Sequence, residues 1–166
     1  SLNYLQSGLL LSALTITSGL SQFPGGWLGD RYSRTLVIAI GLTGVSLTAL
    51  AVGLNSSYYP ILVSLVIMGI VAGAYHPSAT SFIYGHYDEA RRGKVISLHM
   101  AGGSIGFALG PVLGGLIAET LEWRFAYIIL SVPTLVAALW VLKKFGRQTI
   151  QSNDKLPNNI STRTSH

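Results

Sequence analysis

Long apolar blocks alternate with short polar separators along most of the chain. A helix that crosses a bilayer needs roughly 20 mostly apolar residues. Five blocks fit this requirement, and none of them contains Asp, Glu, Lys or Arg. The pattern therefore predicts five transmembrane helices, at residues 4–29, 36–54, 60–85, 95–118 and 125–142.

The character of the chain changes after residue 142. The remaining sequence, KKFGRQTIQSNDKLPNNISTRTSH, is polar and poor in large apolar residues, which predicts a disordered tail. We therefore divide the chain into a membrane region, residues 1–142, and a tail, residues 143–166. The first block lacks a basic segment before it and four more blocks follow, so it is not a signal peptide. The chain begins without Met beside an apolar block, and we expect further residues upstream.

Composition supports an all-α polytopic membrane protein. Hydrophobic residues make up 49% of the chain and charged residues only 10%, whereas soluble domains carry about 25% charged residues. There is no cysteine, which excludes disulfides and thiolate metal sites. The sequence shows no nucleophile–base set, metal-ligand cluster or phosphate loop, so we predict neither an enzyme nor a cofactor. A basic soluble face that could bind nucleic acid is also lacking.

The basic residues predict the orientation of the helices. Basic residues remain on the cytoplasmic side of membrane proteins. Every Lys and Arg except Arg124 lies in the first separator, the third separator or the tail, which fall on the same side. We therefore expect the tail to be cytoplasmic and Ser1 to be outside, in a multi-pass protein of the inner or plasma membrane.

The first separator has an unusual sequence. In GGWLGDRYSRT, residues 25–35, the first charged residues of the chain follow a run of glycines. Taken alone, this is a tight cytoplasmic turn. It also resembles the loop signature G-x-L-a-D-[RK]-x-G-[RK]-[RK] of the major facilitator superfamily, which joins the second and third helices and implies a conformational-switch loop. The matching residues are Gly26, Leu28, Gly29, Asp30, Arg31 and Arg34; Ser33 and Thr35 depart from the family preference.

A second motif lies in the fourth block. GGSIGFALGPVLGG places glycines every fourth residue on one helix face, which lets another helix approach closely, and adds a proline that should bend the helix. A generic GxxxG helix contact is the simpler interpretation. The segment also resembles the fifth-helix motif G-x-x-x-G-P-x-x-G-G of the same superfamily, which is associated with antiporters that export their substrate. The residues concerned are Gly102, Gly106, Gly110, Pro111, Gly114 and Gly115.

The resemblance implies more than the two motifs. WRFAYI, residues 123–128, is similar to the start of the family's sixth helix, so the chain would hold helices two to six of a six-helix half. The family has two such halves around a central substrate path. The implied partners are the lipid bilayer, a small-molecule substrate, protons and a C-terminal half outside this chain.

Polar groups inside the predicted helices are candidates for the transport path, because ionisable residues within spans usually face a cavity. His76 lies roughly 24 Å along its helix from the outer end, and His99 lies at a similar depth. Histidine can carry a proton near neutral pH. The structural alternative is that His76 bonds to backbone or Ser78 beside Pro77, and that His99 is a polar helix end. Gln22 is a third candidate, for which helix–helix hydrogen bonding is the alternative.

The YHP context of His76 resembles the fosmidomycin-resistance-like branch of the superfamily. Many proton-coupled members carry an Arg on the fourth helix, but Leu65 occupies that position here, so an Arg-based proton relay is not implied. We predict a secondary transporter that exports a small organic compound by proton antiport. An uptake symporter for a small metabolite is the nearer alternative, and a membrane-embedded enzyme or sensor scaffold is the alternative from another class.

Overall fold

The computed structural model describes the backbone of residues 3–153 and the side chains of residues 3–145. The described chain folds into long helices without a strand. They are α1 (Tyr4–Arg31), α2 (Arg34–Leu54), α3 (Tyr58–His86), α4 (Glu89–Thr120) and α5 (Trp123–Asn153). The fold class is therefore the all-α class that the sequence predicts.

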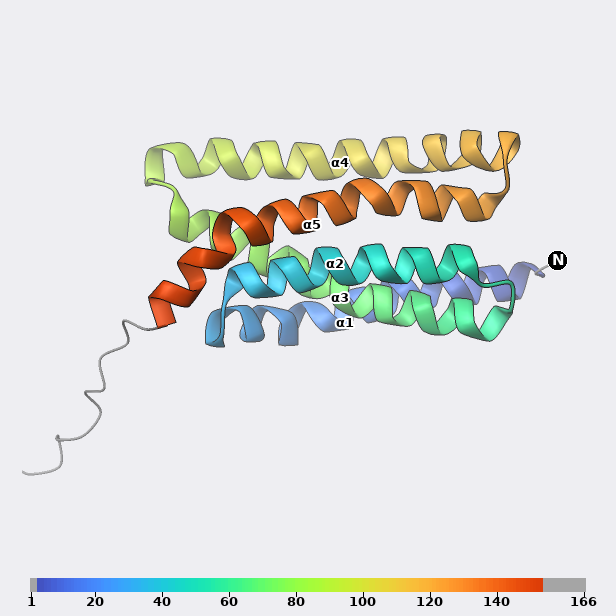
Figure 1. The fold of residues 1–166 in the computed structure, drawn as a ribbon, viewed down its shortest axis with the longest axis horizontal. Coiled ribbons are helices and arrows are strands. Elements are labelled where there is room, and N and C mark those ends of the chain that lie inside the picture. Colours follow the sequence, from blue (N-terminus) through green and yellow to red (C-terminus); the bar gives the residue numbers. More distant parts are fainter. Residues whose placement is uncertain (1–2, 154–166) are drawn as a thin grey trace, which may run out of the picture.

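The helices run alternately up and down and are joined by short turns (Figure 1). The α1–α2 turn, the α3–α4 turn and the end of α5 lie at one end of the molecule, on the left in Figure 1. The turns α2–α3 and α4–α5 lie at the opposite end. The separators rich in Lys and Arg consequently share one end, as the alternation of charge along the sequence predicts.

The closest helix contact joins α1 and α3, and small residues make it possible. A Cβ atom at Gly73 would collide with the backbone oxygen of Ser18 and with Ser21 Oγ of α1. A Cβ at Gly69 would likewise collide with Thr17 and with the Leu14 carbonyl. In lipid, small residues let helices approach backbone to backbone, so that dispersion forces and interhelical hydrogen bonds can hold them together. Ser21 Oγ uses this proximity and donates to the Gly69 carbonyl at 3.3 Å.

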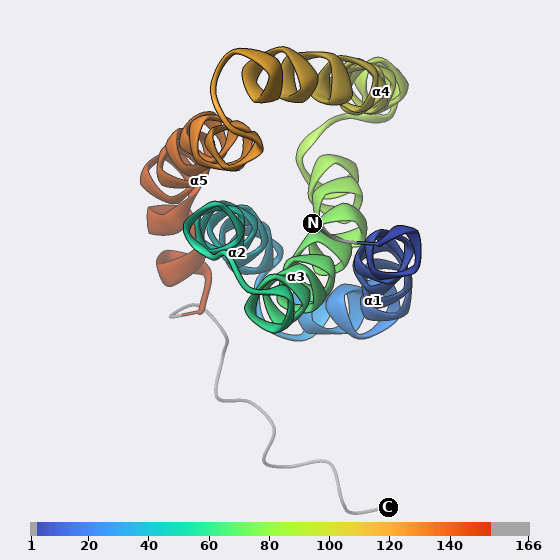
Figure 2. The same cartoon turned by 90° about the vertical axis from the view of Figure 1, so that its right-hand side faces the viewer.

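α2 lies between α3 and α5 and joins them into one bundle. Val52 of α2 packs with Ile61 and Leu65 of α3 in the most buried apolar cluster. On the other side of α2, Ser46 Oγ donates to the Ser131 carbonyl of α5 at 2.9 Å, and both serines are buried. Seen from the end, the helices follow one another in space in the order α1, α3, α2, α5 and α4 (Figure 2).

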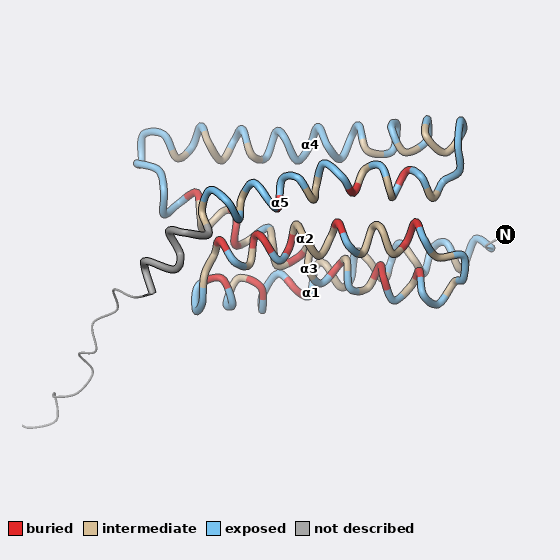
Figure 3. The backbone as a smooth tube through the Cα atoms, in the orientation of Figure 1, coloured by how far each residue is buried: buried red, intermediate tan, exposed pale blue. Residues whose placement is uncertain are grey.

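α4 is the least engaged of the helices. It packs mainly on α5, has little contact with α3, and contains no buried residue. Figure 3 shows α4 as exposed or intermediate along its whole length, whereas α2 and α3 carry buried residues at regular intervals. An apolar helix with so much exposed surface needs lipid or other protein segments around it.

Four of the described helices are long and apolar enough to cross a membrane: α2, α3, α4 and α5. α1, at 28 residues, has the length but is not among them. Its Ser, Thr and Gln residues lower its hydropathy, and three of them, Thr17, Ser18 and Ser21, lie at the contact with α3. The chain is thus a multi-pass membrane protein, with four spans supported by composition and a fifth helix packed against them.

The predicted helix ends differ modestly from the observed ones, and α5 differs most. The polar tail was expected from residue 143, but α5 continues to Asn153. Lys144 lies over the Trp140 ring at 4.7 Å, so basic residues that leave the apolar block still pack on the helix. Residues 154–166 of the predicted tail lie outside the described residues.

Adding a methyl group at Gly73 should destabilise the bundle. Gly73→Ala places a Cβ where Ser18 and Ser21 already lie, and overpacking of this kind costs about 1–3 kcal/mol. We expect a lower Tm for the purified protein in detergent. Gly19→Ala is the matched control, because nothing lies within 4 Å of its Cβ position and alanine favours a helix by about 1 kcal/mol over glycine. An equal Tm for both variants would contradict the close α1–α3 contact.

The shared end of the basic turns should face the cytoplasm. Because the chain has no cysteine, single cysteines can be introduced without background. A membrane-impermeant thiol reagent added outside intact cells should label Ser56→Cys in the α2–α3 turn but not Ser33→Cys in the α1–α2 turn. Labelling of Ser33→Cys from outside would reverse the topology.

Candidate functional site

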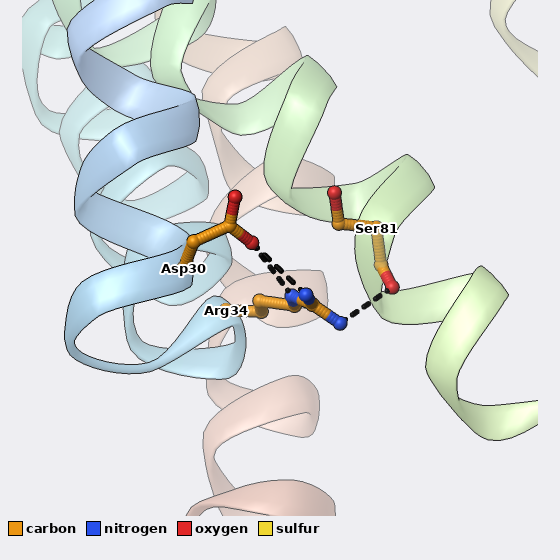
Figure 4. A network of polar contacts seen from close by, with 3 residues as sticks. All are labelled: Asp30, Arg34 and Ser81. Carbon is orange, nitrogen blue, oxygen red and sulfur yellow. Dashed lines mark hydrogen bonds and ion pairs between the residues drawn. The ribbon is translucent and has the colours of Figure 1, made fainter.

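Arg34 ties three helices together at the basic end of the molecule. Its Nη2 and Nε atoms donate to Asp30 Oδ1 at 2.9 and 3.2 Å, which joins the end of α1 to the start of α2. Its Nη1 atom donates to the Ser81 carbonyl of α3 at 3.0 Å. Figure 4 shows the guanidinium group between the carboxylate and the α3 backbone. We call Asp30, Arg34 and Ser81 the Arg34 clamp.

The glycines of the same motif place α1 directly against α3. A Cβ at Gly29 would lie 2.7 Å from Ser78 Oγ, and a Cβ at Gly25 would lie 2.6 Å from the Ala74 Cβ. Gly26 is less tightly packed, with 3.5 Å from its Cβ position to the Pro77 Cβ. The motif thus combines a close helix contact with a polar clamp one turn further on.

The other matched residues of the loop point outward. Leu28 is exposed, and the Arg31 guanidinium carbon lies 5.5 Å from the centre of the Trp27 ring. Ser33, which replaces the family's glycine, begins α2 as its N-cap and accepts a hydrogen bond from the Leu36 amide at 3.2 Å. A residue that departs from the family motif therefore has a clear structural use here.

The glycine stripe of α4 has no partner within the described chain. Nothing lies within 4 Å of the Cβ positions of Gly102, Gly106, Gly110 and Gly114. Gly110, Pro111, Gly114 and Gly115 border an apolar cavity of about 550 Å³ that α2 and α5 close on the other side. Packing of the stripe against a further helix remains a prediction. Such packing requires an open helix face, as observed here.

The two histidine candidates lie at one groove between α3 and α4. The ring of Tyr75 lies near both, with its centre 5.4 Å from that of His76 and 6.2 Å from that of His99. His76 is exposed to the groove, and His99 is half-buried. The sequence analysis identified both histidines as candidates for the transport path but did not show that they would line the same groove.

A hydrogen bond between His76 and Ser78, which the sequence analysis gave as part of the structural alternative for His76, is not formed. Ser78 Oγ is buried and has no hydrogen-bond partner among the described residues, because Ser78 turns toward Gly29 of α1. Gln22 is exposed and belongs to neither the clamp nor the groove. Thr15 and Thr17, two further polar residues of α1, donate hydrogen bonds to carbonyls of their own helix.

Sequence reasoning missed the serines that bond across helices. Ser21 and Ser46 were not distinguished from the many other Ser and Thr residues in the apolar blocks. For Ser21 a signal was available, because it precedes Gly25 and Gly29 by one and two turns on the same face of α1.

Comparison with known proteins agrees with the two motifs. The sequence profile of the Major Facilitator Superfamily matches residues 1–160. The Hexuronate transporter of Bacillus subtilis (strain 168) is 26% identical over 96% of this chain and 38% of its own length. The Tetracenomycin C resistance and export protein of Streptomyces glaucescens is 28% identical over 72% of this chain and 22% of its own length. The Multidrug export protein EmrB of Escherichia coli (strain K12) is 25% identical over 87% of this chain and 28% of its own length.

The chain therefore spans between about a fifth and two fifths of the length of these relatives. All three are transporters or export proteins by name, in line with the prediction that the chain is not an enzyme.

Loss of the Arg34 clamp should destabilise the basic end of the bundle. Arg34→Gln removes the ion pair with Asp30 and weakens the bond to Ser81, and we expect a loss of about 1 kcal/mol because both charged partners are substantially exposed. Arg31→Gln is the control, since Arg31 contacts the Trp27 ring instead. Thermal unfolding in detergent should show a lower Tm for Arg34→Gln than for Arg31→Gln. A larger effect at Arg31 would contradict the clamp.

Proposed function

Because this chain belongs to the Major Facilitator Superfamily, we propose that it is part of a secondary transporter that exports a small organic compound in exchange for protons. Transporters of this kind work by alternating access, in which two halves rock around a site near the middle of the bilayer. This chain contributes helices of one half, and a further half of the same transporter is its partner.

The glycine motif of α4 is the observation that carries the proposal of export. Its pattern resembles the antiporter motif, and its open stripe offers a smooth face on which a helix of the other half can slide. Two of the relatives named above are export proteins, which supports the same direction.

Uptake is the second candidate, and one observation favours it. The hexuronate transporter matches 96% of this chain, more than either export protein. A proton-coupled importer of a sugar acid would use the same fold and the same basic end. The two candidate functions, export and uptake, differ in the side of the membrane from which the substrate is bound.

The Arg34 clamp is suited to stabilise one conformation of the helix ends and to break when they move. It holds the ends of α1 and α2 to α3, yet the Asp30 and Arg34 side chains are 63% and 41% exposed. An ion pair this accessible to water contributes roughly 0–1 kcal/mol, so it can break and re-form as the helices move. We propose that it stabilises one of the two access states at the cytoplasmic end.

Proton coupling is assigned to His76. No Asp, Glu, Lys or Arg occurs between Thr35 and Tyr87, so His76 is an ionisable group within a long apolar stretch. It is exposed at the groove between α3 and α4, which Tyr75 and His99 also line. Leu65, at the position where the family resemblance implies an Arg in many proton-coupled members, is buried in the apolar cluster and cannot carry a proton.

The direction of transport can be tested with membrane vesicles of opposite orientation from cells that express the full-length transporter. An exporter should load a radiolabelled test compound, such as puromycin, into inside-out vesicles when the vesicle lumen is made acidic. Hexuronate accumulation in right-side-out vesicles driven by an inward proton gradient, without puromycin loading of the inverted ones, would establish uptake instead.

His76→Gln should remove the pH dependence of transport. Glutamine keeps the hydrogen-bonding capacity and approximate size of histidine but cannot titrate between about pH 5 and 8. We expect transport rates of the variant to be flat over that range while the wild type varies, with equal amounts of protein in the membrane. His86→Gln, which changes a histidine stacked on Phe82 at the end of α3, is the matched control. A wild-type pH profile in His76→Gln would reduce His76 to a structural role.

A further inference from the structure

α5 turns one face to the bundle and leaves the opposite face exposed. Ser131 and Ala138 are buried, and the Ser131 carbonyl accepts the hydrogen bond from Ser46 of α2. Because seven residues bring a helix back to nearly the same face, Ser131 and Ala138 share the side that meets the bundle. The large apolar side chains of the other side are 54–60% exposed; they are Val132, Val136, Leu139 and Trp140.

Two lysines follow this apolar face at the basic end of the molecule. Val132, Val136, Trp140 and Lys144 are spaced by four residues and form one row along the helix. Lys143 lies beside this row, and both lysines are exposed. The row is about 18 Å long, close to the roughly 15 Å of hydrocarbon in one leaflet. The face thus has the length of a lipid acyl chain, with two cations where the headgroups begin.

Aromatic rings hold Lys144 in place at the boundary between α5 and α3. Its Nζ atom lies 4.7 Å from the centre of the Trp140 ring and 5.5 Å from that of the Phe145 ring. The Phe145 ring meets the Phe82 ring of α3 edge to face, with the centres 5.2 Å apart. In the described chain no Cα atom of α3 lies within 8 Å of one of α5, so side chains alone join the two helices here. An ammonium group attracted to ring faces keeps its N–H donors for another acceptor.

The two lysines have no carboxylate partner in the part of the chain that the structure describes. The ion pair found there joins Arg34 to Asp30, and neither lysine pairs with Asp88 or Glu89, the other acidic residues at this end. Residues 123–145 of α5 contain no Asp or Glu. Phosphate groups accept strong, charge-assisted hydrogen bonds from lysine. The lysines therefore complement the charge of a phosphate that lies at the level of the headgroups.

We propose that this face of α5 binds an anionic phospholipid, whose phosphate bonds to Lys143 and Lys144 and whose acyl chain lies along Val132, Val136 and Trp140. The lipid supplies the negative charge that the lysines lack and covers the exposed apolar row. By the predicted topology it belongs to the cytoplasmic leaflet, whose anionic surface strengthens the attraction about fivefold for each nearby basic residue. The site depends on neither the substrate nor the direction of transport proposed above.

Native mass spectrometry of the full-length transporter in detergent tests the site without any flux. The probes are phosphatidylglycerol and phosphatidylcholine with identical acyl chains. We expect phosphatidylglycerol to bind about tenfold or more tightly, because the choline group cancels the charge of the phosphate. Equal affinity of the two lipids would overturn the proposal. Displacement of phosphatidylglycerol by inorganic phosphate, but not by sodium chloride of equal ionic strength, would overturn the assignment to a lipid and indicate a site for free phosphate.

Paired variants locate the binding. Lys143→Gln/Lys144→Gln should remove the preference for phosphatidylglycerol, and Lys143→Arg/Lys144→Arg should retain it, because the charges remain. Arg91→Gln/Lys94→Gln is the matched control, since it removes two charges from exposed residues of α4 at the same end of the molecule. We expect the control to bind like the wild type. An unchanged preference in the first variant would overturn the assignment to α5, and an equal loss in the control would show a diffuse attraction to the basic end instead of a site.

Discussion

The close approach of α1 and α3 is the contact on which the rest of the bundle depends. Lipid surrounds these helices with a medium as apolar as their own side chains, so the hydrophobic effect does not press them together. Glycines on both helices remove the Cβ atoms that would keep the backbones apart, at Gly25 and Gly29 of α1 and at Gly69 and Gly73 of α3. The resulting contact places Ser81 within reach of Arg34 and fixes which face of α3 remains free.

The free face of α3 is where the groove forms. Because α1 and α2 hold α3 on its other sides, His76 is exposed toward α4, and the weak α3–α4 contact leaves space there. The tight packing of α1 on α3 and the loose packing of α4 against α3 therefore occur on different faces of the same helix. The charged residues are also unevenly distributed. The long apolar segments contain no Asp, Glu, Lys or Arg, whereas the charged residues lie near the helix ends. At one of these ends Arg34 joins three helices.

The sequence predicted the helices well because bilayer thickness and the cost of burying charge act on every residue of a span. It placed the α1–α2 turn correctly and identified both histidines as candidate site residues. It could not show that Tyr75 lies near both, since that depends on the rotation of α3 set by Gly41 and by α1. It also ended the last helix at residue 142, because hydropathy reports the membrane boundary and not the end of helical backbone, which α5 extends to Asn153. The hydrogen bond from Ser46 to the Ser131 carbonyl depends on which helix faces meet, and nothing in the sequence near Ser46 indicates it.

The most direct test is whether positions 29 and 78 lie in contact in the membrane. A Cβ at Gly29 would lie 3.5 Å from the Ser78 Cβ, close to the separation of about 3.8 Å that a disulfide requires. In this cysteine-free chain, Gly29→Cys/Ser78→Cys should form an intramolecular disulfide under mild oxidation in native membranes, detectable by mass spectrometry of the linked peptides. The pair Gly19→Cys/Ser78→Cys should remain reduced, since nothing lies near the Cβ position of Gly19. Equal cross-linking of both pairs, or none at positions 29 and 78, would contradict the close packing of α1 on α3.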